Sequence, residues 1–274
     1  MKGHMTYKQN LHTHSTFCDG KNTPEELVKE AIVRGFDSIG FSMHSHVPCS
    51  GIGSMEALEN YKKEILRLKK HYQDQIKIFL GLEYDIYSDH GPEGYEYAIA
   101  SVHCLKINGI CYDFDQKLEG TLQFLNRHFL GNGTAFARSY YETVASIPQY
   151  GNFDILGHFD LITKNNEKGN FLDVHDPVYL GYAKDAIHAL KGKIPLFEVN
   201  TGCIGRGYRT TPYPQTELLK EFKACGFGAV ITSDCHQKEF LDCNFDNARE
   251  LLKSVGFEGI YVLTDSGFIP NLLT

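Results

Sequence analysis

The sequence predicts an α/β protein in which parallel strands alternate with helices and close into a single barrel. Seven short apolar runs rich in Val, Ile, Phe and Tyr recur along the 274 residues. Segments with helix-start and helix-stop signals lie between most of these runs, which indicates βα units and a parallel sheet. No linker divides the chain, and parallel barrels of about 250 residues commonly form one domain.

Each apolar run has the length and composition of a buried strand. Strands of this kind are typically about four to eight residues long and rich in β-branched and aromatic residues. The seven predicted strands lie near residues 6–12, 37–43, 76–82, 97–102, 153–157, 194–199 and 228–232. We expect them to pair in chain order as a parallel sheet.

The segments between the strands carry helix signals. Thr23-Pro24-Glu25-Glu26 supplies an N-cap, a proline in the first turn and early acids, and Gly35 follows the last helical residue, Arg34. Comparable segments predict helices near residues 55–72, 139–150, 177–191, 214–225 and 245–255. Residues 104–138 are less regular, and we assign them to loop and short helix.

Composition argues against two classes of protein. The net charge of -7 and the scattered Lys and Arg residues argue against nucleic-acid binding, which normally needs a basic stripe. No run of 18 apolar residues occurs that could span a membrane, and the N-terminus lacks the apolar stretch of a secretory signal. We therefore expect a cytoplasmic protein with no membrane or nucleic-acid partner.

The chain is expected to form one domain over residues 5–274, with a natural start at Met5. Residues 1–4 resemble a short expression remnant, so His4 is left out of the candidate functional residues. The oligomeric state leaves no signal in the sequence.

Metal-binding side chains follow six of the seven apolar runs. They are His12 and His14 after the first run, His44, Glu83 and His103 after the next three, His158 and Asp160 after the fifth, and Asp234 and His236 after the seventh. Alternate residues of a strand share a face, so His12 and His14 point the same way. In a parallel barrel the carboxyl ends of the strands meet at one rim, where catalytic residues lie. We therefore expect a shared metal site there.

A single histidine at a strand end is more often a hydrogen-bonded structural residue than a ligand. Independent structural histidines have no reason to gather at the carboxyl ends of strands, however, whereas a shared cation requires it. The histidines in helix or loop contexts are expected to be solvated or capping residues: His71, His128, His175 and His188. The sequence does not decide whether His46 and His90 are ligands.

The ligand types narrow the choice of metal. Imidazole and carboxylate without thiolate suit zinc, iron or manganese, and the histidines are too many for a magnesium site. The candidate ligands also outnumber the four or five that one ion uses. We therefore expect two or three divalent transition metals with at least one bridging carboxylate.

Several stretches carry a family resemblance. They are HTHSTFCDG, FSMHSHVP, ENYKKEILRLKKHY before GLEYD, SVH, RSYYETVASI before ILGHFDL, EVNTG and TSDCH, and they cover nearly the whole chain in order. On these residues the chain resembles the PHP superfamily, named for polymerase and histidinol phosphatase, and within it the monofunctional histidinol-phosphate phosphatases. The resemblance implies a distorted seven-stranded (β/α)7 TIM-like barrel. It also implies hydrolysis of L-histidinol phosphate to L-histidinol and phosphate in histidine biosynthesis.

The resemblance further implies three metals at the rim. His12, His14, Glu83 and Asp234 would hold the first ion; Glu83 would bridge to a second, also bound by His103 and His158; Asp19, His44 and His236 would hold the third. A hydroxide bridging the first two ions would attack phosphorus in line. Paired metals are needed because a lone acid or base, worth roughly 10^2 to 10^4, falls far short of the acceleration of up to about 10^21 for phosphate monoesters.

Four residues are candidates for contact with the substrate. Asp160 shares the strand face of His158 and is expected to shuttle a proton or to pair with the substrate amine, the alternative being a cap for the following loop. Arg206 is expected to bind the phosphate bidentately, the alternative being a surface turn. Glu198 and Asn200 share a strand face and are expected to line the pocket.

Other functions stay open at this point. Another phosphoesterase of the superfamily would act on nucleotides, DNA ends or phosphotyrosine, although the acidic charge disfavours nucleic acid and the helical segment at 55–72 favours the histidinol phosphatase branch. A non-catalytic metal-binding barrel would keep the ligands without an open coordination site. Metal-dependent deamination or amide hydrolysis on a similar barrel is a third alternative. Neither reaction would need an arginine after the sixth strand.

Overall fold

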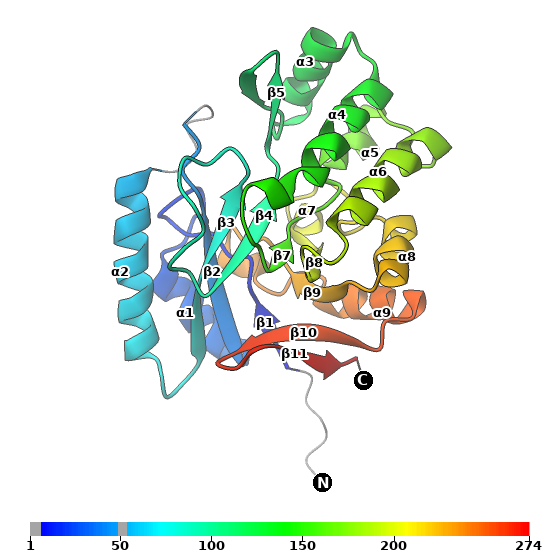
Figure 1. Cartoon of the computed structure of the whole chain (residues 1–274). Coiled ribbons are helices and arrows are strands. Elements are labelled where there is room, and N and C mark those ends of the chain that lie inside the picture. Colours follow the sequence, from blue (N-terminus) through cyan, green and yellow to red (C-terminus); the bar gives the residue numbers. More distant parts are fainter. Residues whose placement is uncertain (1–6, 49–53, 274) are drawn as a thin grey trace.

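Seven parallel strands form one sheet in the order β1-β2-β3-β4-β7-β8-β9. The computed structural model describes residues 7–48 and 54–273, so the expected expression remnant at residues 1–4 lies outside the described residues. The strands are β1 (Gln9–Asn10), β2 (Ser38–His44), β3 (Lys77–Asp85), β4 (Tyr97–Ser101), β7 (Ile155–Leu156), β8 (Leu196–Asn200) and β9 (Gly228–Thr232). A parallel bridge between Thr13 and Cys235 joins the two edges of the sheet, which confirms the predicted barrel (Figure 1).

Helices surround the barrel and connect its strands. The longer ones are α1 (Pro24–Val33), α2 (Met55–His71), α3 (Leu118–Phe129), α4 (Gly133–Ala145), α6 (Pro177–Leu190), α8 (Thr216–Cys225) and α9 (Phe245–Val255). The single turns are α5 (Asn166–Gly169), α7 (Gly202–Gly205) and the 3-10 turns η1 (Ile147–Gln149), η2 (Leu161–Thr163) and η3 (Lys238–Phe240). The start of α1 agrees with the prediction, because Thr23 and Glu26 form a capping box.

The segment 104–138 differs from the prediction. It forms the hairpin of β5 (Cys104–Ile107) and β6 (Ile110–Asp113), then α3 and the first part of α4. Helix α4 begins at Gly133 rather than near residue 139, because the side chain of Asn132 accepts a hydrogen bond from the backbone N–H of Ala135 and caps the helix there. Figure 1 shows β5 and α3 at the carboxyl end of the strands.

The C-terminal segment forms a second hairpin that was not predicted. Its strands are β10 (Gly259–Thr264) and β11 (Gly267–Leu272), at the end of the barrel opposite to α3 (Figure 1). The side chain of Gln9 donates a hydrogen bond to the carbonyl of Leu263 at 2.9 Å and accepts one from its N–H at 2.8 Å. This hairpin therefore closes the floor of the barrel.

The inward-facing side chains of the barrel lie in layers. On β3 they alternate as Phe79, Gly81 and Glu83. The floor is apolar and consists of Leu11, Phe79, Tyr97, Ile99, Ile155, Leu196, Val230 and Leu263. Glu83 lies above it, towards the carboxyl ends of the strands. Apolar side chains thus fill one end of the barrel, and polar ones gather at the other.

Tyr97 fills the middle of the barrel. Its hydroxyl donates to the carbonyls of Leu11 and Phe41. A Cβ atom on Gly81 would lie 2.1 Å from the Tyr97 ring, and one on Gly40 would lie 2.4 Å from the Tyr97 hydroxyl. Glycine at these two strand positions makes room for the ring.

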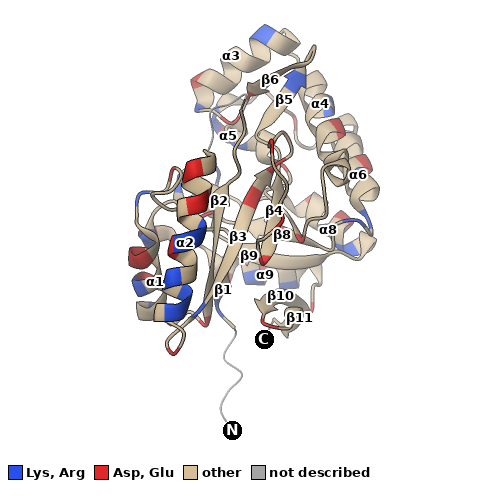
Figure 2. Cartoon of the chain, turned by 60° about the vertical axis from the view of Figure 1, so that its left-hand side comes forward, with Lys and Arg blue, Asp and Glu red and all other residues tan. Residues whose placement is uncertain are grey.

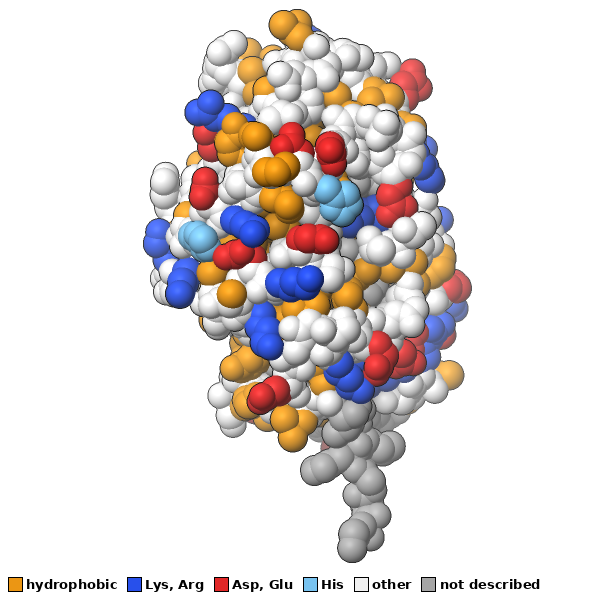
Figure 3. Space-filling view, turned by 90° about the vertical axis from the view of Figure 1, so that its right-hand side faces the viewer, with side chains coloured by type: hydrophobic (Ala, Val, Ile, Leu, Met, Phe, Trp, Pro, Cys, Tyr) orange, Lys and Arg blue, Asp and Glu red, His pale blue; other side chains and the backbone are white. Residues whose placement is uncertain are grey.

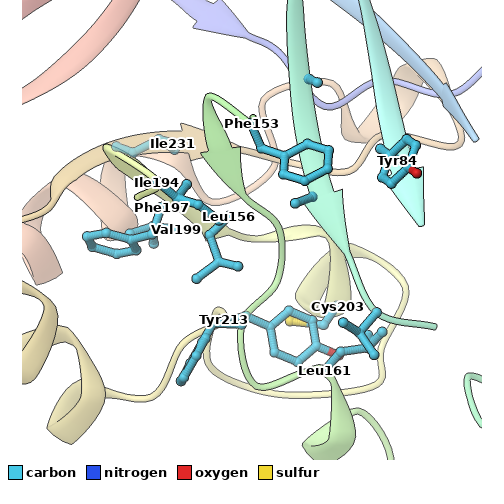
Figure 4. Close-up of a cluster of buried hydrophobic side chains, with 14 of the residues drawn as sticks. Tyr84, Phe153, Leu156, Leu161, Ile194, Phe197, Val199, Cys203, Tyr213 and Ile231 are labelled. Carbon is cyan, nitrogen blue, oxygen red and sulfur yellow. The ribbon is translucent and has the colours of Figure 1, made fainter. Parts of the chain in front are cut away.

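A larger apolar layer lies between the strands and the helices. Phe197 of β8 stacks on Phe222 of α8 with ring centroids 4.3 Å apart. Figure 4 shows part of this layer, in which Leu156, Phe197 and Val199 gather near β7 and β8. Burying each such side chain contributes about 1.5–3 kcal/mol. This packing fixes the strand ends that carry the polar side chains.

Charged side chains of both signs are spread over the outside. Lys and Arg lie on outer helices such as α1 and α2 (Figure 2). On the face formed by α6, α8 and α9, acidic and basic side chains are interspersed (Figure 3). Within the described ranges, none of the helices combines the length and apolar character needed to span a membrane.

Candidate metal centre

The nine predicted metal-binding side chains lie together at the carboxyl end of the strands. His12, His14 and Asp19 follow β1, His44 ends β2, Glu83 lies in β3, His103 and His158 follow β4 and β7, and Asp234 and His236 follow β9. Asp19 and His236 are 217 residues apart in the sequence, yet Asp19 Oδ2 lies 3.1 Å from His236 Nε2. The closed barrel therefore gathers side chains from both ends of the chain.

A first group is formed by His12, His14, Glu83 and Asp234. His12 Nε2 lies 3.3 Å from Glu83 Oε2 and 3.6 Å from Asp234 Oδ1, and His14 Nε2 lies 3.4 Å and 3.2 Å from the same two oxygens. Among the described residues, the buried atoms His12 Nε2, His14 Nε2 and Glu83 Oε2 have no hydrogen-bond partner. Such atoms normally cost about 1–3 kcal/mol each. Their convergence on one point fits a cation.

A second group shares Glu83 with the first. Glu83 Oε1 lies 2.9 Å from His158 Nε2 and 3.2 Å from His103 Nε2. The two imidazole nitrogens are 3.2 Å apart. Since Glu83 turns one oxygen to each group, it is placed as a bridging carboxylate would be.

A third group surrounds the carboxylate of Asp19. Asp19 Oδ1 lies 3.5 Å from His44 Nε2 and 3.6 Å from His14 Nδ1, and Asp19 Oδ2 faces His236. His14 therefore borders both the first and the third group through its two ring nitrogens. Neutral imidazole and carboxylate donors of this kind suit divalent transition metals.

Burial and opposite charges shift the pKa values in the cluster. Burial would raise the pKa of Glu83, but the neighbouring imidazoles, His12 first, hold it well below its usual range. Burial would lower the pKa of His103, but the carboxylate of Glu83 raises it to about 10. For His14, burial and then the charge of His236 lower the pKa to about 3. Glu83 therefore stays ionised and His14 neutral, whereas His103 carries a proton that a metal would displace on binding.

Glu198 and Asn200 do not line the pocket, which corrects the role expected for them. Both are fully buried behind the cluster. The Glu198 carboxylate accepts hydrogen bonds from His12 Nδ1 at 2.9 Å, His158 N at 2.6 Å, Asn200 Nδ2 at 2.8 Å and Thr232 Oγ1 at 2.8 Å. By accepting the Nδ1 proton, Glu198 directs the free Nε2 of His12 towards the first group.

Asp85 supports His103 in a similar way and was missed by sequence reasoning. Asp85 Oδ2 accepts a hydrogen bond from the His103 backbone N–H at 3.0 Å. The same oxygen lies 3.3 Å from His103 Nδ1. Asp85 follows Glu83 by two residues on one strand face, and this spacing was the available signal. The side chain orients a proposed ligand of the second group.

Asp160 also lies outside the pocket, contrary to the expected role in proton transfer or amine binding. Its side chain is 0% exposed. Asp160 Oδ2 accepts a hydrogen bond from Gln215 N at 3.0 Å and lies 3.4 Å from Arg209 Nη1. Burial raises the pKa of Asp160 even though Arg209 opposes the shift. The carboxylate holds the segment after β8 in place and does not reach the pocket.

A pocket of about 220 Å³ opens over the three groups. Besides proposed ligands, it is lined by Asp115, Leu161, Lys164, Arg206 and Tyr208. Arg206 donates to Asp234 Oδ2 at 2.8 Å and to the Asp234 carbonyl at 3.0 Å. Lys164 Nζ donates to Asp115 Oδ1 at 2.7 Å and lies 4.8 Å from the centre of the Tyr208 ring. Two cations thus stand beside the metal-binding side chains.

The sequence reasoning identified Arg206 but not the other side chains of this wall. Asp115 lies in the irregular segment 104–138. Lys164 follows Asp160 by four residues, and Tyr208 follows Arg206 by two. The nearness of Lys164 and Tyr208 to predicted strand ends was the available signal. Nearness alone does not tell which residue of a loop points into the pocket.

The other histidines in residues 7–48 and 54–273 lie outside the three groups. His46 Nδ1 lies 3.0 Å from the carboxylate of Asp89, and the His46 backbone N–H donates to His90 Nε2 at 3.3 Å. His188 lies at the surface, where its Nε2 is 2.8 Å from Glu221 Oε1.

Comparison with known proteins places the chain in a family. The model of the PHP domain matches residues 10–201, which include all the proposed ligands except Asp234 and His236. The chain is 28% identical over 272 residues to the histidinol-phosphatase of Lactococcus lactis subsp. lactis (strain IL1403), covering 91% of this chain and 92% of the relative. It is 27% identical over 256 residues to the histidinol-phosphatase of Bacillus subtilis (strain 168), covering 84% and 94%.

A solved structure shares the fold. The crystal structure of histidinol phosphate phosphatase from Lactococcus lactis, complexed with zinc, L-histidinol and phosphate, matches with a TM-score of 0.73 at 22% identity and covers 96% of this chain and 98% of that chain. Because the PHP domain model matches most of the length of this chain, the chain belongs to the PHP domain family.

Proposed function

We propose that this chain is a metal-dependent phosphatase that hydrolyses L-histidinol phosphate to L-histidinol and phosphate. The observation that carries the proposal is a small pocket in which metal-binding groups joined by Glu83 stand beside two cations, Arg206 and Lys164. The choice of ester is supported by two relatives named histidinol-phosphatase, which cover 91% and 84% of the chain.

The donor sets fit two or three divalent ions of zinc, iron or manganese. The first ion would be held by His12, His14, Glu83 and Asp234, the second by Glu83, His103 and His158, and the third by Asp19, His44 and His236. The zinc in the related structure supports zinc as one of the metals. When bound, such ions neutralise phosphoryl oxygens and lower the pKa of water towards about 7.

Arg206 and Lys164 are placed to bind the phosphoryl group. Asp234 fixes the Arg206 guanidinium through two hydrogen bonds, so its charge is positioned before a substrate arrives. Lys164 is 15% exposed and lies on the wall of the same pocket. Two cations at the phosphate position offset the charge of a phosphate monoester, which is close to two at neutral pH.

The buried carboxylates keep the imidazoles in their orientations. Glu198 holds His12, and Asp85 holds His103, as described above. The pocket of about 220 Å³ is smaller than the clefts of roughly 300–1,000 Å³ that hold drug-sized ligands. Its size supports a small monoester rather than a polymer as the substrate.

Phosphate release from a panel of esters tests this function. The panel contains L-histidinol phosphate, a nucleoside monophosphate, phosphotyrosine and a 5′-phosphorylated oligonucleotide, each measured before and after treatment with a chelator. We expect the highest kcat/KM for L-histidinol phosphate, its loss on chelation and its recovery on adding back zinc or manganese. A preference for a nucleotide or for phosphotyrosine would point instead to another phosphoesterase of the family.

Two variants connect the turnover to the metal centre. His14→Ala and Glu83→Ala are expected to lose both bound metal, measured by elemental analysis, and phosphatase turnover. His71→Ala, an exposed histidine on α2, is the matched control and is expected to keep both. Full metal content and turnover in the first two variants would refute the assignment of the centre.

A further inference from the structure

One carboxylate in the pocket is not used by the proposed metal sites. The carboxylates that line the pocket are Asp19, Glu83, Asp115 and Asp234. Three of them belong to the ligand groups, and Asp115 does not. Asp115 lies between β6 and α3, in the excursion at the carboxyl end of the barrel. Its position leaves it available to the substrate.

Asp115 forms an ion pair with Lys164 on the pocket wall. Lys164 Nζ donates to Asp115 Oδ1 at 2.7 Å, and the Lys164 and Asp115 side chains are 15% and 24% exposed respectively. Burial would raise the pKa of Asp115, but the charge of Lys164 and those of His103 and His158 together lower it, so the group is a carboxylate at neutral pH. An ionised Asp115 cannot give a proton to a leaving group.

The pair would be perturbed by the charge of a phosphate ester. A phosphoryl group beside Arg206 would attract the ammonium of Lys164, which lines the same pocket, away from Asp115. The carboxylate is then left mostly buried without its partner, which is unfavourable. A positive charge carried by the same substrate restores the pair. Because Asp115 touches Lys164 in a pocket of only about 220 Å³, that positive charge would lie close to the phosphate.

We propose that Asp115 binds the ammonium group of the substrate and selects phosphate esters that carry an amine on the carbon next to the ester carbon. This inference rests on the proposed function, since L-histidinol phosphate has its ammonium at that position. It gives to Asp115 the amine contact that the sequence had suggested for Asp160. Lys164 changes partner from Asp115 to the phosphate, and the substrate brings the replacement cation.

A pair of matched esters tests the inference. L-Histidinol phosphate is compared with imidazolylpropyl phosphate, the same ester without the amine, using metal-loaded enzyme. Wild type is expected to prefer the amino ester. Asp115→Asn is expected to lower the ratio of kcat/KM for L-histidinol phosphate to kcat/KM for imidazolylpropyl phosphate by about 10- to 100-fold, mainly through the KM of the amino ester. Asp115→Glu keeps the charge and is expected to retain part of the preference.

Glu119→Gln removes an exposed carboxylate from the same excursion, outside the pocket, and is expected to leave both esters unchanged. An equal loss for both esters in Asp115→Asn, or no loss for either, overturns the inference. If wild type hydrolyses both esters equally well, the phosphatase function stands and the role of Asp115 fails. If wild type hydrolyses neither, the proposed function itself fails.

Discussion

Replacing Glu198 with Gln is predicted to weaken metal binding although no proposed ligand is removed. Glu198 Oε1 accepts hydrogen bonds from His158 N and Asn200 Nδ2, and Oε2 accepts from His12 Nδ1 and Thr232 Oγ1. Glutamine has nearly the same shape, but one end of its amide donates instead of accepting. If the amide nitrogen takes the Oε2 position, His12 Nδ1 and Thr232 Oγ1 must accept instead of donate. If it takes the Oε1 position, His158 N and Asn200 Nδ2 lose their acceptor.

The magnitude follows from the less costly of these two orientations. Glu198 is 0% exposed, and a buried polar contact that is lost costs about 1–3 kcal/mol, so the unfolding free energy should fall by about 1–3 kcal/mol. An amide nitrogen facing His12 would also favour the tautomer with the proton on Nε2, which points at the first group. Loss of such a supporting contact typically lowers metal affinity by about 10- to 100-fold.

Two measurements check this prediction. Competition with a chromophoric chelator gives the metal affinity, and urea denaturation of the metal-free protein gives the unfolding free energy. Glu142→Gln is the matched control, because it alters the exposed pair of Arg138 and Glu142; it should cost less than about 1 kcal/mol and leave metal affinity unchanged. Wild-type metal affinity in Glu198→Gln would refute the orienting role of the buried carboxylate.

Three further predictions concern the phosphate, the core and pH. Arg206→Ala should lower kcat/KM for L-histidinol phosphate by about 10^2 to 10^3, and unchanged steady-state kinetics would remove Arg206 from phosphate binding. Gly81→Ala places a Cβ 2.1 Å from the Tyr97 ring and should lower the unfolding free energy by about 1–3 kcal/mol in urea denaturation; wild-type stability would contradict the packing described. Glu25 has its pKa lowered from 4.5 to about 2 by hydrogen bonds, that from Lys29 first, so its stabilising contribution is complete above pH 4.5 and is lost as the pH falls towards 2. The difference in Tm between wild type and Glu25→Gln should therefore shrink over that range, and a constant difference would be evidence against these contacts.

The strands of the barrel were predictable because each is a buried apolar run between helix signals. The two hairpins were not, because they depend on tertiary context. Gln9, for example, holds β10 through both of its amide atoms, yet neither Gln9 nor Leu263 carries a local signal for that contact. The irregular segment 104–138 likewise forms structure over the barrel mouth without a regular apolar period.

The proposed ligands were predictable because strand ends of a parallel barrel converge. How deep each polar side chain lies within the barrel was not predictable. Glu198 points inward as Glu83 does, but it lies below the mouth and faces hydrogen-bond donors instead of the pocket. Asp160 follows a strand and is nevertheless covered by the segment that carries Arg209. Sequence spacing gives the face of a strand, while burial by later segments decides what reaches solvent.

The edges of the sheet meet through only a short contact. The His14 N–H donates to the Cys235 carbonyl at 2.8 Å, and the Cys235 N–H donates to the His12 carbonyl at 3.0 Å. His12 and His14 stand on one side of this seam, and Asp234 and His236 on the other. An ion shared across it would fasten the beginning of the polypeptide to its end, so ion uptake and completion of the fold become linked equilibria. A chain still emerging from the ribosome, with β9 not yet made, would therefore hold the first ion only weakly.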